Sequence, residues 1–116
     1  NKQAEVIQEI ADKDDCIIVG RCAGYILRDE PKCVRIYISA DKDFRTERIM
    51  ASDHLDEKEA QKKIHSMDKK RDSYFGYYAG QDWKACHTYD LSISTSALGI
   101  DKAVDLICQY IDIKFK

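Results

Sequence analysis

Apolar positions along the chain form short runs and longer stripes with helical spacing. The run at residues 16–20 (CIIVG) is apolar and largely β-branched, which is typical of a parallel strand covered on both faces. Segments 33–39 (CVRIYIS) and 89–95 (YDLSIST) are also rich in strand-forming residues. In the last segment Leu91 and Ile93 alternate with polar residues, which indicates the edge of a sheet. The pattern therefore predicts three strands.

Helical spacing of apolar residues predicts the elements between and around these runs. Asp41 stands where it can cap one helix, and Asp56 with Glu59 resembles a capping box at the start of another. Because strands and helices alternate, the predicted fold class is α/β with a parallel sheet. The helices are expected over residues 1–13, 23–28, 41–52, about 57–76, and the apolar-striped segment after Gly99.

The composition changes this picture little and excludes several classes of function. The chain has 116 residues, with 19 basic and 21 acidic side chains, so no general attraction to nucleic acid or to membranes is expected. The five cysteines are odd in number and have no CxxC spacing, which is typical of reduced thiols in a cytoplasmic protein without a metal site. No apolar run is long enough to span a bilayer.

The first candidate for chemistry is Arg21, which follows the predicted strand at residues 16–20 directly. In open parallel sheets ligands bind outside the carboxyl ends of the strands. A guanidinium at that place can bind a phosphate with two hydrogen bonds. The alternative is an ordinary surface arginine at a turn between a strand and a helix.

The second candidate is the pair Arg45 and Arg48, which lie three residues apart on one face of a predicted helix. This helix also follows a strand, so its start is expected near the same edge of the sheet. The alternative is a solvated helix face on which Glu47 serves as a local ion partner.

The third candidate is Asp68 with Arg71, one helical turn apart among lysines and followed by aromatic residues. Such a segment can bind single-stranded nucleic acid, or it can pack its aromatic end on the core. The acidic overall balance favours packing over general nucleic-acid binding. A mobile basic helix is also what a lid over a nucleotide requires.

Four stretches together resemble the cytidylate kinase-like family, a branch of the P-loop nucleoside monophosphate kinases. They occur in the order and spacing of the family and cover nearly all of the chain. The stretches are IIVGRCAGYIL, VRIYISADKDFRTERI, KKIHSMDKKRDSYF and YDLSISTSALGIDKAVDLI.

The resemblance implies a phosphotransferase that moves a phosphoryl group from ATP, with Mg²⁺, to a CMP-like nucleoside monophosphate. It implies that Arg21 binds the acceptor phosphate, that Asp68 contacts the acceptor ribose and that Arg71 binds the phosphate. Arg45 and Arg48 match a pair associated with the donor nucleotide and the transferring phosphoryl group. These roles suit a reaction that depends on positioning and positive charge more than on a covalent nucleophile.

The chain departs from the family in two places. Cys22 stands where cytidylate kinases have an aspartate, and no G-x-x-x-x-G-K-[ST] phosphate loop is present. The family's sheet also has a central strand between the first two strands predicted here. We therefore expect residues 1–116 to form a single three-layer α/β domain, the C-terminal two-thirds of a P-loop kinase-like domain. It is expected to be incomplete at its N-terminus and inactive alone.

Several alternatives remain open from the sequence. The strands can re-pair directly, or another chain can fill the gap, for example in a homo-oligomer formed through the incomplete sheet. The protein can then be a non-catalytic nucleotide-binding or regulatory protein, or an oligomerisation module on the same scaffold. The sequence also leaves open whether Asp68 and Arg71 bind a ligand or pair with each other.

Overall fold

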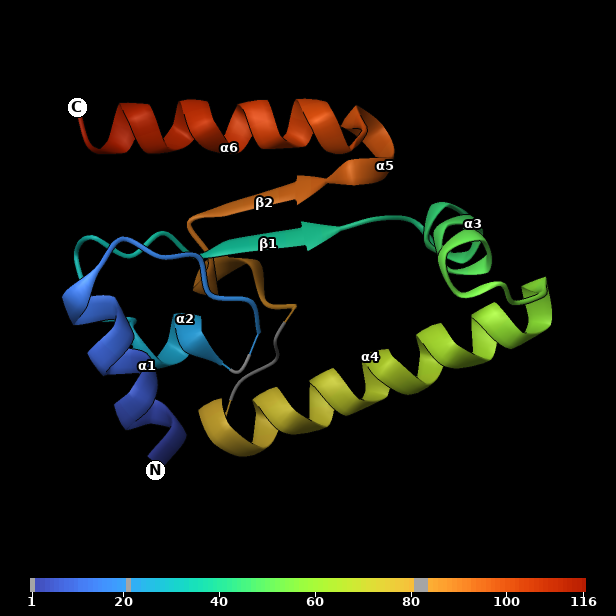
Figure 1. Cartoon of the computed structure of the whole chain (residues 1–116), viewed down its shortest axis with the longest axis horizontal. Coiled ribbons are helices and arrows are strands. Elements are labelled where there is room, and N and C mark those ends of the chain that lie inside the picture. Colours follow the sequence, from blue (N-terminus) through green and yellow to red (C-terminus); the bar gives the residue numbers. More distant parts are fainter. Residues whose placement is uncertain (1, 21, 81–83) are drawn as a thin grey trace.

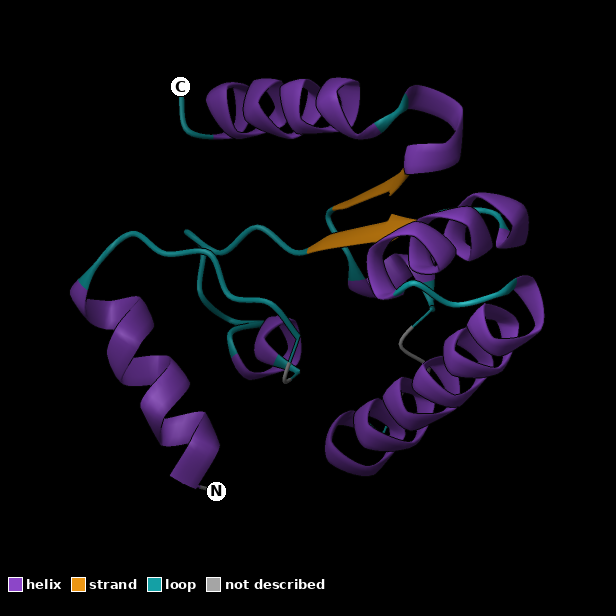
Figure 2. Cartoon of the chain, turned by 45° about the vertical axis from the view of Figure 1, so that its right-hand side comes forward, coloured by secondary structure: helices purple, strands orange, loops and turns teal. Residues whose placement is uncertain are grey.

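The computed structural model describes residues 2–20, 22–80 and 84–116. Figure 1 shows α6 on one side of the two strands and α1, α2 and α4 on the other, an order that the rotated view in Figure 2 preserves. The elements are α1 (Lys2–Lys13), α2 (Ala23–Ile26), β1 (Ile36–Ser39), α3 (Lys42–Asp53), α4 (Glu57–Ala79), the short 3-10 helix η1 (Cys86–Thr88), β2 (Leu91–Ser94), α5 (Thr95–Leu98) and α6 (Ile100–Lys114).

Strands β1 and β2 form a parallel pair, with Ile36 opposite Leu91 and Ser39 opposite Ser94. The chain passes from β1 through α3 and α4 before it returns to β2, as a parallel pair requires. Two of the three predicted strands are therefore confirmed, each shorter than the sequence pattern indicated. Helices combined with a small parallel sheet agree with the predicted α/β class.

The helix starts follow the predicted capping chemistry. The Asp41 carboxylate accepts a hydrogen bond from the Phe44 N–H at 2.8 Å and so caps α3. At α4 the Asp56 carboxylate accepts from the Glu59 N–H at 2.8 Å, and the Glu59 side chain accepts from the Asp56 N–H at 3.3 Å. This reciprocal pair is the predicted capping box. Helix α4 ends at Gly80, whose positive φ of 66° suits a residue without a Cβ.

The predicted strand at residues 16–20 is wrong for this structure. The segment is not part of the sheet, and Ile17 and Val19 are 93% and 88% exposed. Within the described part of the chain, the N–H groups of residues 16–19 make no backbone hydrogen bond. A strand needs a neighbour to receive its hydrogen bonds, and an apolar, β-branched composition does not supply one.

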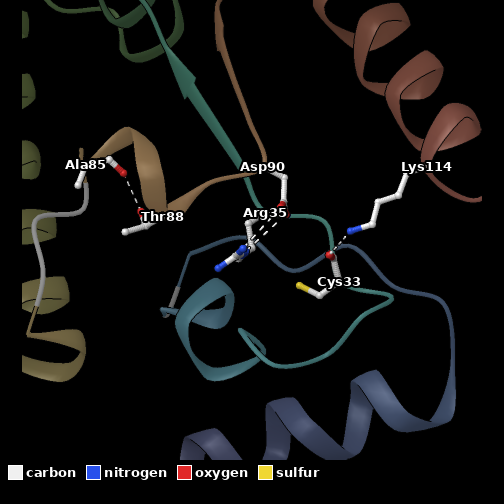
Figure 3. A network of polar contacts seen from close by, with 6 residues as sticks. All are labelled: Cys33, Arg35, Ala85, Thr88, Asp90 and Lys114. Atoms are coloured by element: carbon white, nitrogen blue, oxygen red, sulfur yellow. Dashed lines mark hydrogen bonds and ion pairs between the residues drawn. The ribbon is translucent and has the colours of Figure 1, made fainter.

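A pair of residues at the start of the sheet joins the two strands (Figure 3). The Asp90 carboxylate accepts hydrogen bonds from the Arg35 backbone N–H at 2.7 Å and from its guanidinium Nε and Nη2 at 3.4 and 3.5 Å. In return the Asp90 N–H donates to the Arg35 carbonyl at 2.8 Å. Beside this pair, Lys114 at the end of α6 donates to the Cys33 carbonyl at 3.1 Å. We call Arg35 and Asp90 the strand clamp, because the pair fixes where β1 and β2 begin relative to each other.

These hydrogen bonds also set the acidity of Asp90. Burial by itself would raise the pKa of this carboxyl group, but the Arg35 backbone N–H and guanidinium outweigh burial and hold the pKa below its usual value. Asp90 is therefore ionised in the folded protein at neutral pH and binds Arg35 as an anion. Hydrogen bonds to an ionised acceptor are stronger than those between neutral groups.

The buried core of the described residues is small. The predicted apolar stripe of α6 is largely uncovered, because Ile100, Val104 and Ile111 are exposed. No helix in the described part of the chain combines the length and the apolar character that crossing a membrane would need. The buried apolar residues are Ile7, Cys22, Ala23, Ala60, Ala79, Ile93 and Ala103.

Asp90→Asn should lower the free energy of unfolding at neutral pH by about 1 kcal/mol, since the strand clamp would lose its charge-assisted hydrogen bonds. Because folding lowers the pKa of Asp90, the wild type holds this stabilisation above about pH 4 and loses it as the pH falls through the folded-state pKa. The difference between wild type and variant should therefore shrink in acid. Urea unfolding at a series of pH values measures this difference.

Asp112→Asn is the matched control, because Asp112 is an exposed carboxylate on α6 without a hydrogen bond to any described residue. This control should follow the wild type across the pH range. Equal curves for Asp90→Asn and the wild type would contradict the assignment.

Candidate functional site

The helix α3, which carries Arg45 and Arg48, begins at a fixed position beside the end of the sheet. Arg45 lies in the first turn of the helix that Asp41 caps, and Arg48 lies one turn further on. The Asp41 N–H donates to the Ser96 hydroxyl at 3.0 Å, and Ser96 is the second residue of α5, the short helix that follows β2. The Ser96 hydroxyl in turn lies 2.9 Å from that of Ser94, the last residue of β2. The start of α3 is thus tied to the carboxyl ends of both strands.

Asp68 of α4 connects its own predicted partner, Arg71, with Arg45 of the other predicted pair. Its Oδ1 accepts a hydrogen bond from Arg45 Nη2 at 2.6 Å and lies 3.5 Å from Arg71 Nη1. The Asp68 side chain is only 20% exposed, whereas that of Arg71 is 53% exposed. We call Arg45, Asp68 and Arg71 the arginine–aspartate cluster. Arg48 is exposed and forms no hydrogen bond or ion pair with the described residues.

The cluster contains one pair that the sequence allowed and one contact that it did not reveal. Asp68 and Arg71 pair with each other, as their spacing on one helix allows. The shorter bond, however, joins Asp68 to Arg45, which lies 23 residues earlier on another helix. Only the packing of α3 against α4 brings these two residues together, so no local sequence pattern signals the contact.

A second ion pair links the same two helices away from the cluster. Lys63 Nζ of α4 binds the Asp53 carboxylate of α3. Hydrogen bonds from Lys63 and then Ser52 lower the pKa of Asp53. The family resemblance implies no role in the reaction for Asp53. The Lys63–Asp53 pair therefore joins α3 to α4, as the Arg45–Asp68 contact does, but without residues of the candidate site.

Arg21, the first predicted site residue, lies outside the described residues. Of its neighbours, Gly20 and Cys22 both have positive φ values, 72° and 56°. Cys22 is buried, and this burial raises the pKa of its thiol, so the thiol stays protonated at neutral pH.

A cleft of about 290 Å³ lies between α1, α2 and the C-terminal part of α4. The Tyr74 hydroxyl of α4 donates to Gln3 Oε1 of α1 at 2.7 Å, and the Arg28 guanidinium lies 4.1 Å from the centre of the Tyr25 ring. Tyr74 in the aromatic end of α4 therefore contacts α1, whereas Tyr77 and Tyr78 are exposed, so this end is only partly packed. The cleft is lined by Gln3, Ala4, Gln8, Cys22, Tyr25, Ile26, Arg28, Tyr74 and Tyr78.

The arginine–aspartate cluster is suited to an anion rather than to a metal ion. Two guanidiniums share one carboxylate, which leaves net positive charge, and a guanidinium is well shaped for phosphate oxygens. Among the described residues, no group of three or more His, Cys, Asp or Glu side chains could hold a metal ion.

The parallel strand pair, joined by a helical connection, defines an α/β protein with a small parallel sheet. A model of the cytidylate kinase-like family matches residues 1–97, and the chain belongs to this family.

Individual relatives agree with this assignment. A curated cytidylate kinase from Desulfurococcus amylolyticus is 29% identical over an alignment of 108 residues, and the alignment covers 91% of this chain and 57% of that protein. A crystal structure of an uncharacterized protein from Eubacterium ventriosum superposes with a TM-score of 0.92 at 38% identity, over 96% of this chain and 63% of the other. The chain thus spans less than two thirds of the length of each of these relatives.

The bond between Arg45 and Asp68 should be measurable as an energetic coupling. Replacing each residue by alanine, singly and together, should give a coupling free energy of about 0.5–1 kcal/mol in urea unfolding, the range for a partly exposed ion pair. The same cycle with Arg48 in place of Arg45 should give a value near zero, because Arg48 lies on the same helix without this bond. Equal couplings in the two cycles would contradict the described geometry.

Proposed function

We propose that the complete natural protein transfers a phosphoryl group from ATP to a nucleoside monophosphate with a CMP-like base. The observation that carries this proposal is the arginine–aspartate cluster, which gathers residues from two of the family's motifs. Membership of the cytidylate kinase-like family supports the same reaction.

In this reaction a phosphate oxygen of the acceptor attacks the γ-phosphorus of ATP. The bond from the γ-phosphorus to the bridging oxygen breaks as the new bond forms, so the products are ADP and a nucleoside diphosphate. Arg21 and Arg71 would hold the acceptor phosphate, and Asp68 would accept a hydrogen bond from the ribose. Arg45 and Arg48 would stabilise the charge on the transferring group, which is the main task in such catalysis.

The phosphates of ATP and its accompanying Mg²⁺ call for further residues. Among the described residues no group of three or more His, Cys, Asp or Glu side chains could hold a metal ion, and the sequence has no G-x-x-x-x-G-K-[ST] loop. We therefore propose that residues 1–116 are the C-terminal two-thirds of a three-layer, P-loop kinase-like domain and are inactive alone.

Features of the sheet support this division of the domain. Within the described residues β1 pairs only with β2, so its other edge has no strand partner. Ile17 and Val19, in a segment with strand-like composition, are almost fully exposed. A strand between β1 and residues 16–19 would accept hydrogen bonds from the N–H groups of residues 16–19. It would also help to cover the side chains of Ile17 and Val19.

The complete protein should convert ATP and CMP to ADP and CDP, and Arg21→Ala or Arg71→Ala should reduce kcat/KM roughly 10²-fold or more, because each removes a phosphate ligand. Lys102→Ala, which removes an exposed cation of α6, is the control and should behave like the wild type. A coupled ADP-release assay with several monophosphates measures both the rates and the base preference.

Nucleotide binding without turnover by the complete protein would instead identify the non-catalytic alternative. Near-normal rates in both arginine variants would remove these residues from the site.

The division of the domain has a test of its own. In the 116-residue chain, the amides of residues 16–19 should exchange with solvent within seconds, because they have no backbone partner among the described residues. In the complete protein the same amides should be protected to the level of β1 and β2, which serve as the internal reference. Hydrogen exchange followed by mass spectrometry compares the two proteins. Unprotected amides at residues 16–19 in the complete protein would contradict the proposed strand.

A further inference from the structure

The two oxygens of the Asp68 carboxylate have different surroundings. Oδ1 receives Arg45 Nη2 at 2.6 Å and is the atom that lies near Arg71. Oδ2 accepts no hydrogen bond from the described residues. One carboxylate therefore offers an oxygen for a ligand while its other oxygen already holds a guanidinium.

Arg45 depends on this carboxylate for its orientation. Its Nη2 donates to Asp68, and this is the hydrogen bond that its guanidinium makes within the described residues. The other N–H groups of the guanidinium remain available to an anion. The backbone of Arg45 is held through Asp41 and Ser96, whereas the long side chain is held at its tip by Asp68.

We propose that Asp68 is a positioning residue for Arg45 and thereby links the two nucleotide sites. This inference rests on the proposed function, in which Asp68 meets the acceptor and Arg45 meets the transferring phosphoryl group. An acceptor ribose on Oδ2 fixes the carboxylate, and the carboxylate holds the guanidinium at the place where negative charge develops. An arginine that is already oriented loses less conformational entropy in the transition state.

A positioning role for Asp68 differs from the role of an ion pair that only holds two helices together. Lys63 and Asp53 also join α3 to α4, through a lysine and an aspartate without an implied role in the reaction. If only the attachment of the helices mattered, loss of either ion pair would have similar effects. A positioning role predicts that loss of Asp68 alone changes catalysis, and that it does so through Arg45.

The test uses the complete natural protein with Asp68→Asn, Arg45→Ala, Arg48→Ala and the two double variants that contain Asp68→Asn. Asp68→Asn keeps the size of the side chain and removes its charge, and it should lower kcat roughly 10- to 100-fold, the cost of a misplaced group. In the Asp68→Asn background, Arg45→Ala should cause little further loss of kcat. Arg48→Ala should cause its full loss there, because Arg48 does not bind Asp68.

A second acceptor separates positioning from ribose binding. With 2′,3′-dideoxycytidine monophosphate the ribose hydroxyls are absent, so a residue that only binds the ribose can no longer contribute. Asp68→Asn should still lower kcat with this acceptor. Asp53→Asn is the matched control, and it should leave kcat and both KM values unchanged with either acceptor.

The outcomes separate this inference from the proposed function. A wild type without phosphoryl transfer would overturn both. If the wild type is active but the losses of kcat from Asp68→Asn and Arg45→Ala multiply fully in the double variant, the inference is overturned and the proposed function stands. The same holds if Asp68→Asn changes only the KM for CMP, or if it has no effect with the dideoxy acceptor. Urea unfolding of each variant checks that the comparison is made on folded protein.

Discussion

The structure depends on the mutual pairing of Arg35 and Asp90 at the start of the two strands. Each residue donates a backbone N–H to the other, and the guanidinium adds an ionic component. A parallel pair of four-residue strands has few ladder hydrogen bonds, so its register is weakly specified by the ladder alone. The clamp supplies the missing specification because it allows one alignment, in which Ile36 faces Leu91.

This alignment is carried along the strands to the candidate site. With the starts of β1 and β2 aligned, Ser39 and Ser94 come side by side at the other end. There the Thr95 hydroxyl donates to the Ser39 carbonyl at 3.1 Å, and the Ser96 hydroxyl accepts from the Asp41 N–H. The first turn of α3 is therefore set by the sheet. Packing of α3 on α4 then brings Arg45 to Asp68.

The sequence predicted the features that are decided within a few residues. The Asp41 cap and the Asp56–Glu59 capping box depend on side chains that reach only three residues along the chain. The sequence allowed the pair Asp68 and Arg71, which one helical turn brings together, without deciding whether the two residues pair or bind a ligand. Arg45 and Asp68 come from different helices, so their bond depends on packing that no local pattern encodes.

The one wrong element prediction has a related cause. Residues 16–20 have the composition of a buried strand, but strand formation also requires a neighbour with free backbone groups. The described residues provide such a neighbour for β1 and β2 and provide none for this segment. The composition of residues 16–20 thus suits a buried strand, but the described residues offer this segment no strand to pair with.

The crossover from β1 to β2 finds its contact partners within the described residues, whereas the segment before Arg21 does not. The partners of Arg45, Asp68 and Arg71 all lie within the crossover, and the clamp that aligns its two ends lies at the strands themselves. The cluster therefore needs no contact beyond the described residues to take its shape. The N–H groups of residues 16–19, by contrast, make no backbone hydrogen bond within the described part of the chain. Arg45, Asp68 and Arg71 are thus held together by contacts within the described residues, whereas the strand-like segment at residues 16–19 has no such support there.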